Sequence, residues 1–348
     1  MTAPVTALIG INGTGGEFQM AVSGKQTRMD MLDAIDHGIS FCVEKKKNNG
    51  EDCEKHALNG EAAFFGVFDG MGGAGAKSCP RFDGKTEAYI ASRVTGDAFV
   101  RWFENGCETG RWQPETLKSR LVSELEDCRA AVGERSMLVG GIKKEFPTTA
   151  AAGICRIGDR RIEIELFWAG DSRVYLLNTQ GLAQLTEDDL GGIDAMENLR
   201  SDGALTNMVN LTQDFTIHRA HLSMDRPGVI FAASDGCFGY LSTPMEFEYL
   251  LLETMMSSNR VRSVPGGPGD SWTDNLISAI GEVAGDDYSL SGYSIGFGPF
   301  GEMKKAFSPR ARELYGSFIA PLKNADYQRK LELWHQYEGN YHRMLNRA

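Results

Sequence analysis

One stretch of the sequence, residues 63–73, constrains this chain more than any other. Its apolar residues, rich in phenylalanine, stop abruptly at Asp69, and three of the next four residues are glycines. The pattern predicts a buried strand that ends in a tight turn and holds the Asp69 carboxylate at the end of a sheet. Because Asp-Gly is also the commonest two-residue hairpin turn, this stretch alone leaves a structural turn and a functional carboxylate open.

Composition and charge limit the classes of partner. The chain carries 36 basic and 47 acidic residues, a net charge of −11, so we expect neither nucleic acid nor an anionic membrane as a partner. Seven scattered cysteines form no C-x-x-C pair, which favours reduced thiols. The N-terminus has no export signal, and no apolar run approaches the roughly 18 residues of a membrane span. We therefore expect a soluble, cytoplasmic protein.

Hydrophobic periodicity predicts paired helices between runs of short strands. The helices are expected at 85–105, where Gly106 would be the C-cap, and at 114–133, 243–256 and 272–283. The strands are expected at 38–43, 150–157, 162–168, 173–177, 228–234 and 288–297. This order indicates an α+β fold with antiparallel sheets rather than strict βαβ alternation.

The sequence pattern divides the chain into three parts. Residues 1–34 form an N-terminal lead-in, 35–298 a catalytic-type domain with a Gly-rich flap at about 188–210, and 299–348 a helical C-terminal extension. In the extension, apolar residues fall on one side of a helix: Tyr327, Leu331, Trp334, Tyr341 and Leu345. This side either packs on the chain's own domain or binds a partner protein.

Acidic residues recur at predicted strand ends. Besides Asp69 they are Asp171, Asp235 and Asp286, and the pair Glu51-Asp52 precedes the Asp69 strand. Strand ends on one edge of a sheet meet in space, and carboxylates that converge repel one another unless they are protonated or bridged by cations. No Cys/His cluster lies near them, so an all-oxygen site would select hard ions such as Mg²⁺ or Mn²⁺.

An ordered series of motifs resembles the metal-dependent protein phosphatases, also called protein phosphatase 2C. The series covers residues 38–298: Glu51-Asp52, Val67 to Gly73, Thr148-Thr149-Ala150, Trp168 to Tyr175, Leu185-Thr186, Ser234-Asp235-Gly236 and Asp286 to Ser289. The resemblance implies a four-layer α-β-β-α sandwich of two antiparallel sheets flanked by helix pairs, here followed by the C-terminal helical extension.

The same resemblance implies a site with two Mn²⁺ or Mg²⁺ ions, with Asp171 at a third, weaker one. In it Asp69 bridges the ions, Gly70 offers its backbone carbonyl, and Asp235 and Asp286 hold the second ion. Glu51 reaches the metals through water, and Asp52 is its acidic neighbour. The implied reaction is hydrolysis of phosphoserine or phosphothreonine in a protein by a metal-activated water.

Six positions depart from the family pattern, two of them only mildly. Lys47 stands where an arginine usually binds phosphate, and Gly50 replaces an asparagine; lysine cannot bind phosphate bidentately. Met71, at the place of a histidine in many eukaryotic members, is similar to the bacterial branch. Gly239 replaces an aspartate that helps hold the third metal. Asp189 and Asp287 are milder substitutions, and the six histidines show no ligand or triad spacing.

Two alternatives to a protein phosphatase stay open. One is a catalytically weak, phosphatase-like adaptor that binds partner proteins through its C-terminal helices. The other is a metal-dependent hydrolase of small phosphorylated metabolites, whose flap and tail would shape the rim of the cleft.

Overall fold

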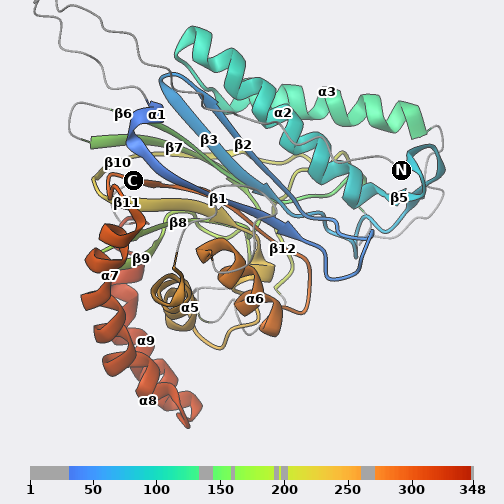
Figure 1. Cartoon of the computed structure of the whole chain (residues 1–348). Helices are drawn as coiled ribbons and strands as arrows, with labels where there is room; N and C mark the ends of the chain where they lie inside the picture. The colour runs from blue at the N-terminus through green and yellow to red at the C-terminus, as the bar shows by residue number, and fades with distance from the viewer. Residues whose placement is uncertain are drawn as a thin grey trace, which may run out of the picture.

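Two five-stranded antiparallel sheets form the centre of the molecule (Figure 1). The computed structural model describes residues 31–132, 144–157, 161–191, 196, 203–259 and 271–345. Most of the predicted lead-in and part of the predicted flap lie outside these ranges.

The first sheet contains the first and the last strand of the domain, side by side. Its strand order is β1 (Ile35–Val43), β12 (Tyr288–Ile295), β11 (Gly228–Ala233), β8 (Arg173–Asn178) and β9 (Gly181–Gln184). The second sheet has the order β10 (His218–Asp225), β7 (Arg161–Ala169), β6 (Ala150–Ile157), β3 (Ala62–Phe68) and β2 (Cys53–Asn59). A two-stranded ribbon pairs β4 (Ser78–Cys79) with β5 (Lys85–Thr86).

Helices cover the outer face of each sheet (Figure 1). On the second sheet lie α2 (Glu87–Thr109) and α3 (Pro114–Val132), and on the first lie α5 (Pro244–Ser257) and α6 (Trp272–Val283). The short α1 (Met31–Ala34) precedes β1. This arrangement confirms the predicted four-layer α-β-β-α sandwich.

Helices also follow the last strand, as predicted. They are α7 (Phe300–Leu314), a π-helical turn (Tyr315–Ile319), α8 (Ala320–Leu322) and α9 (Tyr327–Tyr341). In α9 the predicted apolar side is only partly right, because Trp334 and Tyr341 are buried whereas Tyr327 is 47% exposed. The buried side chains of α9 belong to the core that also contains α5, α6 and the first sheet. This side of α9 therefore packs on the chain's own domain.

Three hydrophobic cores separate the layers. One lies between the sheets, a second between the second sheet and α2 and α3, and a third between the first sheet and the remaining helices. All seven cysteines are free. No helix among the described residues is both long enough and apolar enough to cross a bilayer.

The end of α2 differs from the prediction. Gly106 is buried inside the helix, where a Cβ would collide with the Trp112 indole, and the C-cap is Gly110 with a φ of 66°. The helix therefore runs on to Thr109. Gly106 is required for close packing against Trp112, and Gly110 is the glycine that adopts the positive φ of a C-cap.

Candidate metal and phosphate site

The turn after β3 places Asp69 at the end of the second sheet. The strand is buried along its whole length, and its last residue, Phe68, packs against α2. Two threonines then fix the turn: the Asp69 carbonyl accepts hydrogen bonds from the Thr149 backbone N–H and the Thr148 hydroxyl, both at 2.8 Å. The Thr-Thr motif therefore holds the aspartate turn in place.

Glycine is required at two positions of this turn. A Cβ on Gly70 would lie 2.5 Å from the Ala88 carbonyl oxygen, and one on Gly72 would collide with the Glu51 carboxylate. Any other residue would push the turn away from α2 or displace Glu51. The glycines after Asp69 thus allow the close approach of three chain segments.

Four aspartates from distant parts of the sequence converge beside this turn. The Asp69 carboxyl lies within hydrogen-bonding reach of the carboxyls of Asp52 and Asp235. Asp171 is near enough to interact electrostatically with Asp69 and Asp235. Distant strand ends are therefore brought together, as the recurrence of acidic turns predicts.

Burial and mutual repulsion raise the pKa of all four carboxyls. Burial is the largest cause for each, and it raises the pKa of Asp52 and of Asp171 to about 7. The pKa of Asp69 is raised well above its usual range by burial and then by Asp52 and Asp235. The pKa of Asp235 is also raised, by burial and by Asp286. Carboxyls in this condition favour a shared proton or a cation over four separate charges.

Hydroxyl groups orient the most buried member, Asp52, which is 2% exposed. Its Oδ2 accepts hydrogen bonds from Ser234 Oγ at 2.7 Å and Ser289 Oγ at 2.8 Å. Neither serine was assigned a role from the sequence, although both belong to motifs that carry the resemblance. Their function depends on the pairing of β11 with β12, which the sequence alone does not give.

Glu51 lies at the rim of the cluster. Its carboxylate accepts a hydrogen bond from Thr86 Oγ1, and its backbone N–H donates to Asp287 Oδ2 at 2.7 Å. Burial raises the pKa of Glu51, as do Asp287 and Asp286. Arg93, another residue without a predicted role, holds this segment by donating to the carbonyls of Gly50 and Glu51 at 3.1 and 3.0 Å. Asp286 itself is exposed, at the turn before β12.

A buried ion pair between Arg173 and Asp188 lies close to Asp171. Arg173 donates to Asp188 at 2.8 and 2.6 Å, and it also donates to the Tyr341 hydroxyl of α9 at 3.4 Å. The negative charge of Asp188 contributes to the raised pKa of Asp171. The C-terminal helix therefore contacts the residues that set the electrostatics of Asp171.

Asp189 and His218 have structural contacts. Asp189 accepts hydrogen bonds from the Gly170 backbone N–H at 2.9 Å and from Asn207 at 2.8 Å, and it pairs with His218 at 2.8 Å. It ties the turn before Asp171 to the described part of the predicted flap. This is consistent with the structural role expected for His218.

The four carboxyls interact electrostatically with one another. Within the ranges that the structure describes, no three His, Cys, Asp or Glu side chains form a ready-made metal-ligand group. The donor set is nevertheless all oxygen, and each pKa is raised by neighbouring negative charge, so a hard divalent cation fits the cluster chemically. The cluster that such a cation would fit consists of Asp52, Asp69, Asp171 and Asp235.

A cavity of about 520 Å³ lies beside the carboxylate cluster. Its lining includes the acids Glu51, Asp286 and Asp287 and the lysines Lys45, Lys46 and Lys85. Lys47, the predicted phosphate-binding residue, is exposed on the same loop but does not line this cavity. Its role stays a prediction.

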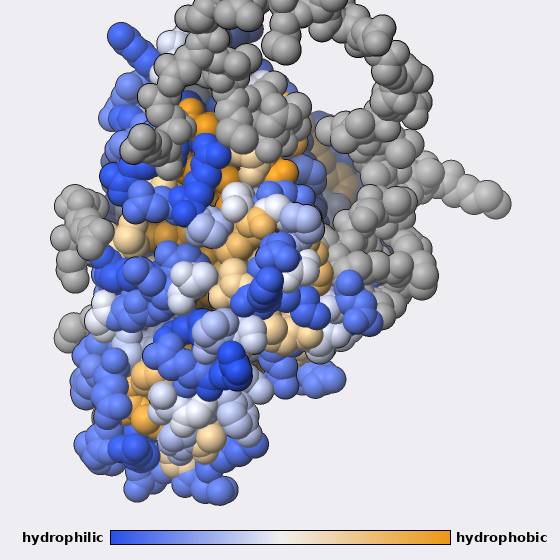
Figure 2. Space-filling view, turned by 60° about the vertical axis from the view of Figure 1, so that its left-hand side comes forward, coloured by the Kyte–Doolittle hydropathy of each residue, from blue (hydrophilic) through white to orange (hydrophobic). Residues whose placement is uncertain are grey.

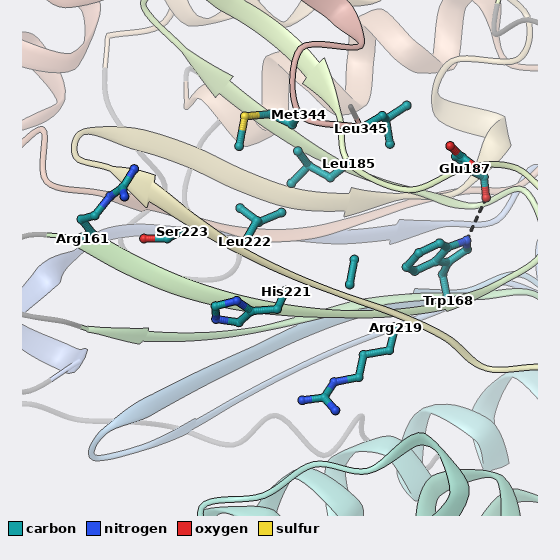
Figure 3. Close-up of a pocket in the computed structure, with 11 residues that line it drawn as sticks. Arg161, Trp168, Leu185, Glu187, Arg219, His221, Leu222, Ser223, Met344 and Leu345 are labelled. Atoms are coloured by element: carbon teal, nitrogen blue, oxygen red, sulfur yellow. Dashed lines mark hydrogen bonds between the residues drawn. The ribbon is translucent and has the colours of Figure 1, made fainter. Parts of the chain in front are cut away.

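A second cavity, of about 560 Å³, lies away from the cluster (Figure 3). Leu185, Leu222, Met344 and Leu345 point into it, and Arg161, Arg219 and His221 lie along β7 and β10 (Figure 3). Figure 2 brings this side of the molecule forward and shows apolar surface between hydrophilic patches. None of the predicted site residues lines this second cavity.

Comparison with known proteins finds the same fold in bacterial phosphatases. No protein-family model matches the chain. A curated relative from Mycoplasma genitalium, named "Putative protein phosphatase", is 24% identical over 269 residues, which cover 71% of this chain and 97% of the relative.

Solved structures extend the comparison. A bacterial serine phosphatase aligns with a TM-score of 0.52 and 17% identity, covering 74% of this chain and 97% of that one. The serine/threonine phosphatase of S. agalactiae gives 0.51 and 16%, covering 75% and 99%. Stp1 of Staphylococcus aureus also gives 0.51 and 16%, covering 79% and 100%. This chain therefore has the fold of the bacterial serine/threonine phosphatases, as its resemblance to the metal-dependent protein phosphatases predicts.

Proposed function

We propose that this protein is a divalent-metal-dependent phosphatase that hydrolyses phosphoserine and phosphothreonine in proteins. The observation that carries the proposal is the convergence of Asp52, Asp69, Asp171 and Asp235, with the pKa of every carboxyl raised by burial and by neighbouring acids. The shared fold and the M. genitalium relative support the same reaction class.

In the proposed site, Asp69 and Asp235 hold the cations directly, together with Asp286 and the Gly70 carbonyl. Glu51 and Asp171 complete the polar surroundings, and Asp171 is the residue for a third, weaker ion. Mn²⁺ or Mg²⁺ bound there lowers the pKa of a coordinated water and polarises the phosphoryl oxygens.

The chain's own residues keep this arrangement in place. Thr148 and Thr149 hold the backbone of the Asp69 turn, and Ser234 and Ser289 fix one oxygen of Asp52. The low accessibility of Asp52 keeps its side of the cluster away from bulk water, where a charge interacts more strongly with a cation. The phosphate oxygens require a basic side chain, for which Lys47 is the predicted candidate.

The test is hydrolysis of a generic aryl phosphate by the full chain. Activity should require Mn²⁺ or Mg²⁺, disappear with a chelator and fall at least about a hundredfold in Asp69→Asn. Asp235→Asn should behave in the same way. The matched control is Asp97→Asn, which changes an exposed aspartate on α2 that pairs with Lys55 on β2. Full metal-independent activity, or full activity in Asp69→Asn, would overturn the proposal.

A phosphopeptide and a small phosphorylated metabolite distinguish the substrate class. We expect the phosphopeptide to be turned over with the higher kcat/KM, and the reverse order would favour the metabolite hydrolase. The adaptor alternative gains no support from the structure, because the apolar side of α9 is occupied by the chain's own core. Cytoplasmic localisation stays a prediction.

A further inference from the structure

Acidic and basic side chains both line the cavity beside the carboxylate cluster. The acids are Glu51, Asp286 and Asp287, which we call the acidic wall, and the first two belong to the proposed metal site. Facing the same space are Lys45, Lys46 and Lys85, which we call the lysine rim. Lys45 and Lys46 come from the loop after β1, whereas Lys85 comes from β5, next to the start of α2. Two separate segments therefore bring basic side chains to one place in a chain of net charge −11.

No ammonium group of the lysine rim forms an ion pair with a carboxylate of the described residues. Lys45 Nζ donates to the Ala284 carbonyl at 2.5 Å, and Lys85 Nζ donates to the Asn48 carbonyl at 2.6 Å. The Lys46 ammonium makes no hydrogen bond or ion pair within the described residues. A carbonyl partner fixes a lysine side chain but leaves its positive charge uncompensated.

Some other lysines of this protein are paired with acids. Lys55 lies 2.7 Å from Asp97, and Lys118 lies 2.6 Å from Asp214. Lys304, by comparison, donates to the Ser258 carbonyl at 2.6 Å, as Lys45 and Lys85 do to theirs, so the distinguishing feature of the lysine rim is that its three lysines line one cavity.

The surroundings of Lys85 are well fixed. Its ammonium lies 4.4 Å from the centre of the Tyr89 ring, and the Arg93 guanidinium lies 3.6 Å from the same ring. Arg93 in turn holds the backbone of Glu51. The N-terminus of α2 is also here, where the helix dipole favours a negative group. The lysine rim and the acidic wall are thus built on one connected set of contacts.

We propose that the lysine rim binds acidic side chains next to the phosphorylated residue, so that the preferred substrates are acidic phosphopeptides. This inference rests on the proposed function, in which the phosphate lies at the metal site. An extended peptide advances about 3.3 Å per residue. Because the acidic wall and the lysine rim line one cavity, Asp or Glu residues a few positions from the phosphate reach the lysines.

The test compares two phosphothreonine peptides of equal length, one flanked by glutamates and the other by glutamines. For the wild-type full chain with Mn²⁺ at low salt, kcat/KM should favour the glutamate peptide by about tenfold, given up to fivefold for each exposed charge pair. The preference should shrink markedly in 0.5 M NaCl, because exposed charges are screened.

Variants locate the preference. Lys46→Ala and Lys85→Ala should each reduce the ratio of the two kcat/KM values, and the double variant should bring it close to one. The matched control Lys118→Ala/Lys305→Ala removes the same charge from α3 and α7, outside the cavity, and should keep the wild-type ratio.

Aryl phosphate hydrolysis, measured in parallel, separates two kinds of failure. If the wild type does not hydrolyse the aryl phosphate, the proposed function itself is wrong. If it does, yet turns over both peptides equally, only the lysine rim proposal is overturned. A wild-type preference that survives in Lys46→Ala/Lys85→Ala would also overturn it.

Discussion

The C-terminal helices are joined to the domain by a buried ion pair whose removal has a calculable cost. Glu248 on α5 is fully buried, and Arg310 on α7 donates to its two oxygens at 2.6 and 3.0 Å. The Tyr337 hydroxyl of α9 donates a third hydrogen bond. Arg310→Met therefore leaves a buried carboxyl with a single neutral partner.

The expected loss in the free energy of unfolding follows from the least unfavourable way to avoid a buried charge, which is protonation of the carboxylate. A glutamate can take up a proton, and each pH unit above its ordinary pKa of about 4.3 costs about 1.4 kcal/mol. Arg310→Met should therefore lower the free energy of unfolding by about 4 kcal/mol at pH 7, in line with other broken buried pairs, and by only about 1 kcal/mol at pH 5.

Urea denaturation, followed by tryptophan fluorescence, measures this loss; one of the five tryptophans is the buried Trp334, whose ring centroid lies 6.0 Å from that of Tyr337. Arg310→Met/Glu248→Leu should recover most of the stability, because an apolar pair needs no charge compensation. The control is Arg329→Met, which breaks an exposed pair with Glu332 and should cost less than about 1 kcal/mol. A loss in Arg310→Met that equals the control, or that does not change with pH, would refute this reasoning.

Three further predictions concern packing, pH and metal. Gly106→Ala should destabilise the protein by about 1–3 kcal/mol, because its Cβ collides with Trp112, whereas Gly339→Ala, at an exposed site in α9 with nothing nearby, should stabilise it by up to about 1 kcal/mol; thermal unfolding compares the two. In metal-free protein, the pKa of Asp52 and of Asp171 is about 7, above the ordinary aspartate value near 4. Between these values the folded state binds more protons than the unfolded state, so the free energy of unfolding should fall as pH rises from about 4 to 7. Mn²⁺ bound beside these carboxyls competes with their protons, so the increase in melting temperature that Mn²⁺ causes should be larger at pH 8 than at pH 6; an equal or smaller increase at pH 8 would contradict binding of the cation at the carboxylate cluster.

Much of the fold follows from local patterns in the sequence. The strand at 150–157 was predicted with its observed bounds, because its β-forming residues are bounded by clear turn signals. The helix at Pro114 was likewise marked by proline at its first position. Where one residue type serves two purposes, the prediction was wrong, as for Gly106. The strands β2, β9 and β10 were not predicted, because β2 and β10 are largely polar and β9 is only four residues long.

The site was predictable in its acids and not in their partners. Asp69, Asp171 and Asp235 stand out as acids at the ends of apolar strands, and the structure brings them together. The serines at 234 and 289 gain their role only when β11 pairs with β12. Arg93 and Lys85 reach the site from α2 and β5, elements whose position depends on tertiary packing. No local pattern signals such contacts.

The pairing of β1 has a consequence for how the polypeptide matures. Phe41 is paired with Leu290, and the whole of β1 has β12 as its hydrogen-bonded neighbour in the sheet. Contacts between such distant residues form slowly, because a long loop must close before they stabilise anything. During translation, β1 has to wait until about 250 further residues have been made, which takes roughly 10–50 s at ordinary elongation rates. The first sheet, and with it the pocket between Glu51 and Asp286, is therefore assembled late in synthesis.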